Sequence, residues 1–465
     1  MFPKTYHSLN KGMRPSLLLT TAMLFISGCV STPEKQAARL EEAVSTPETY
    51  ASDHMEAPQL VDSLLELFQD PQLAELSQTA LANNPNLLAV YAQLEESNFN
   101  LKKAQAGLFP SLSADGSAGR SGGNSKATTT SYSAGLDARW EVDVWGGIRN
   151  SVKASKANNA ALTANYEAAQ QSLVAQSMQS WFNLITQGKL LDLAERRRDS
   201  LADTERLLTR QYESGTATLA ALELARTDAA NARADYQSAT EDRNQAARAL
   251  QTLLGQYPDA SLIAARSWPA LERTVPTGLP SELLLVRPDI VAAYQQILAA
   301  DARVKVAYAD LFPSFTLTAS GGRSSDTLSN LGRSGFDVWS LAGQVSAPLL
   351  DGGLRRAELG AAGKRAEQAY QSYRSVVLNA FREVENALSA ERYLLNEETA
   401  RLEALKAARR AEAKTLRDYE SGLTDILTLL EAQRRVFSTE ERTINLHAAR
   451  LTNRVSLALA IGRGV

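Results

Sequence analysis

The sequence predicts a mainly α-helical chain built as a tandem duplication, in which four β-strands contribute to a membrane β-barrel and the helices form long coiled coils. Three observations lead to this fold class. Leu108-Phe109-Pro110-Ser111 returns 203 residues later as Leu311-Phe312-Pro313-Ser314. Alternating apolar and small polar residues follow each copy, as in a β-strand. Each half then holds roughly 65 residues almost free of helix breakers.

Further landmarks recur in the same order at nearly constant spacing. They are Pro85 and Pro288, Tyr212–Gly215 and Tyr419–Gly422, and Leu254-Gly255 and Ile461-Gly462. The period is far longer than the roughly 20 to 50 residues of solenoid repeats. We therefore expect two copies of one large unit, at 59–255 and 286–465, each reading helix, strand, loop, strand, long helix, turn, long helix.

The N-terminus resembles a bacterial export signal that ends in a lipidation site. Lys4, Lys11 and Arg14 precede an apolar run, and Ile26-Ser27-Gly28-Cys29 follows it. We expect residues 1–28 to be a lipoprotein signal peptide and Cys29, the single cysteine, to be acylated. The alternative is an ordinary signal peptide with an incidental cysteine. The residue after Cys29 is Val30, and the aspartate usual in retained inner-membrane lipoproteins is absent, so we expect a lipid-anchored outer-membrane protein that extends into the periplasm.

Residues 29–58 are polar and interrupted by prolines, which indicates an extended tether leaving the membrane. Short helices are expected at 59–69 and 71–82. Pro85 then begins a helix to about residue 107, because proline is tolerated in a first helical turn, where its missing N–H costs nothing.

Strands are expected at about 108–120 and 131–144, and again at about 311–323 and 336–349. Each has one apolar and one polar face, and each is long enough to cross a bilayer. A half-buried sheet on a soluble core would show the same alternation, but the outer-membrane address favours a barrel. The links at 120–130 and 323–335 are polar and rich in glycine and serine, as extracellular loops are.

The apolar face is expected to meet lipid and the polar face the lumen. The lipid-facing row includes Leu136, Ala138, Trp140, Leu317 and Leu341, whereas Ser133 and Thr316 face the lumen. Trp140, Trp145 and Trp339 are candidates for an aromatic girdle at the membrane interface, with the alternative that Trp145 packs beneath the barrel.

Long helices are predicted at 148–212 and 354–419, each about 100 Å if continuous. Apolar residues recur every seven positions, which indicates coiled-coil seams. These are Phe381, Leu388, Leu395 and Leu402 in one helix, and Leu430, Phe437, Ile444 and Leu451 in the next. Five prolines between 256 and 288 predict an irregular inter-repeat link, assigned to 256–285.

Each long helix turns back at a Ser-Gly tip. Glycine directly after a helix is a common left-handed cap, and we expect that role together with docking of a partner. The candidate docking residues are Ser214, Gly215, Thr216, Ser421, Gly422, Leu423 and Thr424. Thr216 and Thr424 are expected to lie just beyond the caps.

Composition and motifs argue against several functions. The 49 basic and 52 acidic residues are balanced, which argues against a nucleic-acid partner. Only three histidines occur, and no zinc-protease, phosphate-loop or nucleophile-elbow motif is present. We expect neither an enzyme nor a bound cofactor or metal.

Four strands cannot close a barrel, and open strand edges are not tolerated in lipid. Other copies of the chain must therefore complete the sheet. Cyclic symmetry allows about eight, twelve or sixteen strands, from two, three or four copies. The larger barrels can leave a channel.

Longer motifs identify a family. Besides the lipidation site and the doubled Leu-Phe-Pro-Ser, they are Trp140-Glu-Val-Asp-Val-Trp-Gly-Gly-Ile-Arg149, Pro276-Thr-Gly-Leu-Pro-Ser-Glu-Leu-Leu-Leu-Val-Arg-Pro-Asp-Ile290, Phe381-Arg-Glu-Val-Glu385 and Tyr419-Glu-Ser-Gly-Leu423. The chain resembles the outer-membrane efflux proteins of the TolC superfamily, lipoprotein branch typified by OprM and NodT. One departure is Tyr294, where the family usually carries glutamate.

The resemblance implies a homotrimer with a 12-stranded β-barrel and a 12-helix periplasmic tunnel. It implies an exit channel that passes drugs or other small molecules from an inner-membrane pump and a periplasmic adaptor to the exterior. The alternative is a non-conducting lipoprotein scaffold or adhesin with a helical stalk. Met55 and Met178 are the only methionines after the signal peptide, which argues weakly against a dedicated copper or silver exporter.

In related channels the acidic residue nine positions after the tip glycine forms a ring at the narrowest point. Counting from Gly422 gives Glu431 as the gate residue. Arg434 and Leu427, one turn to either side, are the candidates that hold the closed state. The alternative is a solvated helical glutamate paired with Arg434.

Overall fold

The computed structural model describes residues 49–52, 64, 67–68, 70–124, 126–265, 267–271, 280, 283 and 286–462. The chain divides into two units, Met1–Ser45 and Thr46–Val465, and every described residue lies in the second. The signal peptide, Cys29, nearly all of the expected tether and most of the expected helix at 59–69 therefore fall outside the described residues.

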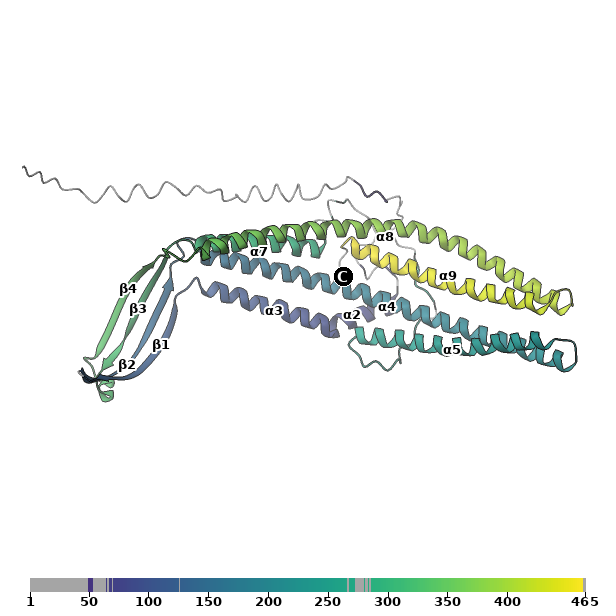
Figure 1. Ribbon diagram of the computed structural model, residues 1–465, viewed down its shortest axis with the longest axis horizontal. Helices are drawn as coiled ribbons and strands as arrows, with labels where there is room; N and C mark the ends of the chain where they lie inside the picture. Colours follow the sequence, from purple (N-terminus) through teal and green to yellow (C-terminus); the bar gives the residue numbers. More distant parts are fainter. Residues whose placement is uncertain are drawn as a thin grey trace, which may run out of the picture. The chain divides into compact units, whose positions relative to one another are not determined.

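The described chain repeats one series of elements (Figure 1). The first copy has α2 (Pro71–Asn83), α3 (Pro85–Ala106), β1 (Ser111–Gly123), β2 (Lys126–Glu141), α4 (Gly147–Glu213) and α5 (Leu219–Leu253). The second has α7 (Pro288–Ala309), β3 (Ser314–Ser325), the 3₁₀ turn η1 (Leu328–Gly332), β4 (Asp337–Ser346), α8 (Leu354–Glu420) and α9 (Ile426–Ala460). The helices α4 and α8 have 67 residues each, and α5 and α9 have 35 each. The tandem duplication is confirmed, and α4 runs through Gly188 without interruption.

The four strands form one antiparallel sheet in the order β1-β2-β3-β4. Trp140 pairs with Leu317, and Ala138 pairs with Ala319, which pairs with Leu341. Because paired residues share a face, the predicted row of Leu136, Ala138, Trp140, Leu317 and Leu341 does lie on one face of the sheet. Ser133 and Thr316 lie on the other.

The strand boundaries differ from those expected, most of all in the first hairpin. The predicted loop at 120–130 is wrong, because β1 continues to Gly123 and β2 begins at Lys126. Serine and glycine favour loops, but threonine favours strands, and the backbones of all three can pair when a partner strand lies alongside. At the other end, 108–110 and 142–144 lie outside the strands. In the second hairpin, β3 and β4 span 314–325 and 337–346 instead of 311–323 and 336–349.

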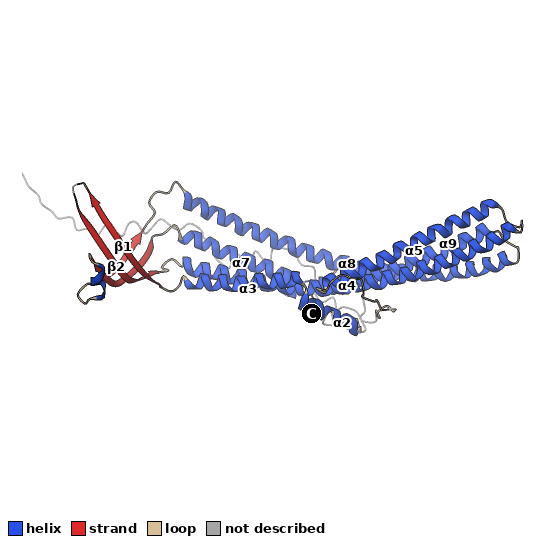
Figure 2. Cartoon of the chain, turned by 90° about the horizontal axis from the view of Figure 1, so that it is seen from below, coloured by secondary structure: helices blue, strands red, loops and turns tan. Residues whose placement is uncertain are grey.

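The helices form two successive layers, and α4 and α8 run through both (Figure 2). Next to the sheet, helix contacts give the order α3-α4-α7-α8. Toward the hairpin tips the order is α5-α4-α9-α8. Among the described residues, no helix combines the length and the apolar character needed to cross a membrane.

The two layers join where a returning helix ends against a new one. The Asn84 side chain at the start of α3 donates to the carbonyl oxygen of Leu253 at the end of α5 (2.9 Å). At the equivalent place in the second repeat, Arg287 donates to the carbonyl oxygen of Ala460 (2.9 Å). Gly255 has a φ of +70°, and a Cβ there would lie 2.5 Å from the Asn83 carbonyl oxygen. This junction therefore requires glycine.

Apolar packing is concentrated on α4. Phe182, Met178, Leu184 and Ile185 are almost completely buried, and Phe68 packs edge-on against Phe182 at a ring distance of 5.0 Å. Near the tips a second cluster joins the two hairpins; it includes Leu208, Leu222, Leu429 and Leu430.

The heptad prediction is right for α9 and, within the single chain, only partly right for α8, where Leu388 is buried. In α9, Leu430, Phe437 and Leu451 are buried. In α8, Leu395 and Leu402 are 48% and 43% exposed. The buried positions lie three residues later and include two carboxylates: Val384, Glu391, Glu398 and Leu405. This seam escaped prediction because Glu391 and Glu398 are buried against cations of α9, which α8 alone does not reveal.

Candidate functional site

Each helical hairpin ends in a tight turn closed by a glycine and a new N-cap. In the first tip, Gly215 has a φ of +77°, and the Thr218 side chain accepts from the N–H of Ala221 (3.2 Å). In the second tip, Gly422 has a φ of +72°, and Asp425 accepts from the N–H of Thr428 (2.8 Å). The predicted glycine caps are confirmed.

The tips present an open surface. A Cβ added at Gly215 or Gly422 would have nothing within 4 Å, so a side chain there would point into open space. Ser214 and Ser421 are exposed, and Leu423 is 77% exposed.

The expectation that Thr216 lies just beyond the cap is wrong, because Thr216 is part of the cap. Its N–H donates to the carbonyl oxygen of Gln211 (2.8 Å), and its hydroxyl donates to the same oxygen (3.0 Å). Its hydroxyl also lies 3.0 Å from that of Ser214. Thr424 is half-buried directly before the N-cap Asp425.

The two tips are held to each other. The Tyr419 hydroxyl donates to the Gln211 side chain (2.8 Å), which joins α8 to α4. Ile426, Leu429 and Leu430 of α9 pack into the cluster formed by α4 and α5. Movement of one tip away from the other therefore has to break both polar and apolar contacts.

The predicted gate residues lie together on the exposed side of α9. Glu431 accepts from Arg434 (3.2 Å), and the side chains are 55% and 54% exposed. Leu427, one turn before, is 50% exposed. The structure adds Arg435, which reaches the second Glu431 oxygen (3.4 Å). Sequence reasoning missed Arg435, although its i, i+4 spacing is a recognised signal for such a pair.

A charged groove of about 720 Å³ extends from these residues over α4. It is lined on α9 by Glu431, Arg434 and Arg435, and on the other side by Arg197 of α4 and Asp235 of α5, which form an ion pair of 3.0 Å. The gate residues therefore belong to a surface of alternating charge.

The buried carboxylates of the second hairpin form an ion-pair seam. Glu391 pairs with Arg454, and Glu398 contacts both His447 (2.5 Å) and Arg450. Burial alone would raise the pKa of Glu398, but hydrogen bonds and charge from His447 and Arg450 outweigh it and hold the pKa below 4.5.

A third carboxylate, Glu440, joins three helices. It contacts Arg196 of α4 (2.6 Å) and Arg409 of α8 (2.9 Å). Burial alone would raise the pKa of Glu440. The hydrogen bonds and positive charges of Arg196 and Arg409 outweigh burial, so the pKa is lowered. At the positions equivalent to Glu391 and Arg454, the first hairpin carries buried Leu184 and Ala247, so this ionic pair has no counterpart there.

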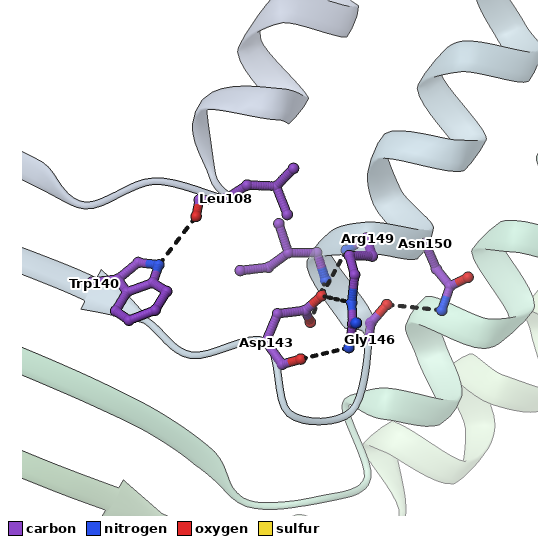
Figure 3. A network of polar contacts seen from close by, with 7 residues as sticks. Leu108, Trp140, Asp143, Gly146, Arg149 and Asn150 are labelled. Carbon is purple, nitrogen blue, oxygen red and sulfur yellow. Dashed lines mark hydrogen bonds and ion pairs between the residues drawn. The ribbon is translucent and has the colours of Figure 1, made fainter.

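The junction from β2 to α4 is closed by Asp143 (Figure 3). Its carboxylate accepts from the N–H groups of Ile148 (3.0 Å) and Arg149 (2.9 Å) and from Arg149 Nε (3.0 Å). Gly146, with a φ of +78°, turns the chain, and Trp140 donates to the carbonyl oxygen of Leu108 (3.2 Å). The carboxylate satisfies free N–H groups of the first helical turn.

Trp145 lies beside this junction and packs beneath the strands, as the alternative expectation had it. It donates to the carbonyl oxygen of Pro313 (2.7 Å) and stacks on Phe312 at a ring distance of 4.7 Å. Phe312 and Pro313 precede β3, so Trp145 fastens the first strand-to-helix junction to the second repeat.

The polar face of the sheet is lined by small hydroxyl groups and a few charges. Ser117 and Ser133 lie 2.8 Å apart between their hydroxyls, as do Ser320 and Ser340. Asp137 pairs in register with Ser320. Such a face is suited to water and polar solutes.

Within the described ranges, no group of three or more His, Cys, Asp or Glu side chains could hold a metal ion. Met178 is fully buried in the α4 core, and Met55 lies outside the described residues. The lipidation prediction for Cys29 also lies outside them.

Comparison with known proteins identifies the family. The model of the family described as "Outer membrane efflux protein" matches residues 76–256 and 279–463. The cation efflux system protein CusC of Escherichia coli K12 is 29% identical over 464 residues, covering 97% of this chain and 100% of CusC. The solvent efflux pump outer membrane protein SrpC of Pseudomonas putida is 30% identical over 457 residues, covering 95% and 97%.

Solved structures agree. The open-state outer membrane channel MtrE of Neisseria gonorrhoeae superposes with a TM-score of 0.81 at 30% identity, covering 90% of this chain and 96% of MtrE. The chain belongs to the outer membrane efflux protein family and is an exit channel of an efflux system in the cell outer membrane.

Proposed function

We propose that three copies of this chain close a 12-stranded barrel and a 12-helix tunnel that serves an inner-membrane pump through a periplasmic adaptor. The observation that carries this proposal is a set of open edges. The sheet ends in β1 and β4, the sheet-proximal helix layer in α3 and α8, and the tip layer in α5 and α8. At every level one edge comes from the first repeat and the other from the second.

These edges fit head-to-tail closure. The strand β1 of one copy can continue β4 of the next, and α8 of one copy can pack against α3 and α5 of the next, which is the heterologous contact that builds a ring. The leucines Leu395 and Leu402 on α8 keep a heptad spacing although they are exposed in the single chain, which supports a neighbouring helix there.

The adaptor is proposed to dock on the two tips, at Ser214, Gly215, Thr216, Ser421, Gly422, Leu423 and Thr424. Support comes from the open surface around Gly215 and Gly422 and from the exposed Leu423. The gate is proposed to be a ring of Glu431 with Arg434, Arg435 and Leu427. Neither proposal involves catalysis or a bound cofactor: the channel is a passive conduit.

The cargo is proposed to be chosen by the pump. The names of CusC and SrpC refer to cargoes as different as cations and solvents. The polar face of the sheet, with its serine hydroxyls and the carboxyl of Asp137, does not favour one chemical class. Buried Met178 cannot serve as a soft ligand in a lumen, so nothing in the described residues favours copper or silver as a dedicated cargo.

Single-channel recording tests the channel. Purified full-length protein in planar bilayers should give discrete conductance steps, and native mass spectrometry should give a mass of three copies. A purified protein that inserts but never conducts would support a scaffold or adhesin instead. Any other stable copy number would overturn the trimer.

A further inference from the structure

Two arginines lie on the apolar face of the sheet. In β1, Arg120 lies an even number of residues from Leu112, Ala114 and Ala118. In β3, Arg323 lies an even number of residues from Leu317 and Ala319. Side chains alternate between the faces of a strand, so both arginines share the face predicted to meet lipid.

Both arginines lie toward the strand ends away from the helices. From Leu112 to Arg120 there are eight residue steps, about 27 Å along the strand. A strand tilted by about 40° then rises roughly 20 Å, close to the roughly 25 Å height of a barrel's apolar band. Arg120 therefore stands at the outer boundary of that band. The free-energy cost of an arginine that faces lipid is large at the membrane midplane and close to zero at this depth.

The charge of this surface is not neutralised within the described chain. Arg120 is exposed, and no ion pair of its guanidinium is found among the described residues. Arg323 pairs with Asp337 (3.0 Å) and still has 40% of its side chain exposed. On the opposite face, Arg139 lies between Asp137 and Glu141 in β2. The cations of the apolar face thus outnumber the carboxylates beside them. We call Arg120 and Arg323 the basic rim.

We propose that the basic rim binds the phosphate groups of lipopolysaccharide in the outer leaflet of the outer membrane. That leaflet consists largely of a glycolipid with phosphates on its sugars directly above the acyl chains, at the depth of the rim. Guanidinium groups bind phosphate through paired hydrogen bonds, and basic residues beside an apolar surface attract anionic headgroups. The inference rests on the outward orientation of the apolar face in the proposed barrel.

The test measures how strongly the assembled protein binds one phosphorylated lipid. Purified full-length protein in detergent is titrated with bisphosphorylated lipid A carrying its two inner-core sugar acids, and bound lipid is counted by native mass spectrometry. Phosphatase-treated lipid A, which keeps the acyl chains, is the comparison. Arg120→Gln is the main variant, and Arg139→Gln, on the other face of the sheet, is its matched control.

We expect wild-type protein and Arg139→Gln to retain the phosphorylated lipid, with at least tenfold weaker binding of the dephosphorylated lipid. Arg120→Gln should weaken binding of the phosphorylated lipid roughly fivefold, and a further Arg323→Gln by a similar factor. Equal binding of the two lipids, or unchanged binding in Arg120→Gln, overturns the proposal. So does loss of the assembled oligomer in lipid-free Arg120→Gln, because Arg120 would then pair with a neighbouring copy.

Conductance of the same samples keeps this inference separate from the proposed function. Arg120→Gln should conduct as wild type does while losing lipid. Protein that binds the phosphorylated lipid but never conducts would refute the channel proposal and leave the basic rim in place.

Discussion

Arg287 donates a hydrogen bond to the carbonyl oxygen of Ala460, and this bond joins the N-cap of α7 to the last turn of α9. The guanidinium is buried and also pairs with Asp289 (2.6 Å) and Glu383 (2.9 Å). One side chain thus satisfies a free helix-end carbonyl and connects α7, α8 and α9 at the boundary between the two helix layers.

Arg287→Ala should destabilise this junction, because it removes the guanidinium that the Ala460 carbonyl, Asp289 and Glu383 share. We expect a loss of about 1–3 kcal/mol per chain in the free energy of unfolding. Urea titration of the detergent-solubilised protein measures it. Asn84→Ala, the equivalent change in the first repeat, also removes the N-cap of α3, so it should cost a similar amount without any loss of charge pairing. An unchanged free energy of unfolding in Arg287→Ala would show that the junction does not depend on the guanidinium.

The pair Glu391–Arg454 should depend on both partners. Arg454→Ala alone leaves a buried carboxylate and should cost about 3–5 kcal/mol. The double variant Glu391→Leu/Arg454→Ala reproduces the Leu184 and Ala247 of the first hairpin, and it should recover most of that stability. If Arg454→Ala and the double variant melt at the same temperature, the destabilisation by Arg454→Ala comes from lost packing.

The gate should depend on both arginines beside Glu431. Arg434→Ala leaves Arg435 in contact with Glu431, so we expect the double variant Arg434→Ala/Arg435→Ala to raise resting conductance and antibiotic uptake more than either single change. Glu431→Ala should lower cation selectivity, because it removes the carboxylate ring. Planar-bilayer recordings with wild-type selectivity in Glu431→Ala would place the ring elsewhere.

The tips can be separated into cap and docking functions. Gly422→Val is strained at a φ of +72° and should impair the cap itself. Leu423→Glu keeps the backbone and changes only an exposed side chain, so it should weaken adaptor binding without loss of assembled protein. Pull-down with the adaptor and a drug-efflux assay check this. Thr216→Val serves as the cap control; normal efflux in Leu423→Glu would exclude that leucine from docking.

The two faces of the sheet should respond differently to charge. Leu136→Arg, on the apolar face, should cost about 2–4 kcal/mol at the membrane midplane, whereas Ser133→Arg should cost far less. Ser133 is the cleaner control, because Thr316 is buried between Glu141 and Gln344. Heat-resistant oligomer on gels is the measurement, and equal loss from both variants would contradict the assigned faces.

Acid should loosen the junction that Asp143 closes. Burial raises the pKa of this carboxyl, but hydrogen bonds from Arg149 and Ile148 outweigh it, so the folded pKa lies below 3.8. A lowered folded pKa means that the stabilisation is complete above 3.8 and is lost as pH falls through the folded value. Asp143→Asn should therefore show a smaller loss of melting temperature than wild type below about pH 4. Identical acid profiles would assign the acid sensitivity to other groups.

The sequence by itself determined the repeat, through motifs that return about 203 residues later. It also determined the long helices, the two faces of each strand and the glycine caps at Gly215 and Gly422. Each of these last features depends on residues within a few positions of one another, through side-chain periodicity or the φ of a single glycine. The pairing of Glu431 with Arg434 belongs to the same class, since one helical turn separates them.

The tertiary structure alone decided which helices become neighbours. It therefore also decided the buried seam of α8 and the hydrogen bonds from Arg287 to Ala460 and from Tyr419 to Gln211. Glu398 looks like a solvated residue in the sequence, because glutamate is rarely buried without a partner. Its partners His447 and Arg450 lie 49 and 52 residues away, on a helix that only folding brings alongside. Such carboxylates are buried because another element supplies the opposite charge, and no period within one helix encodes that.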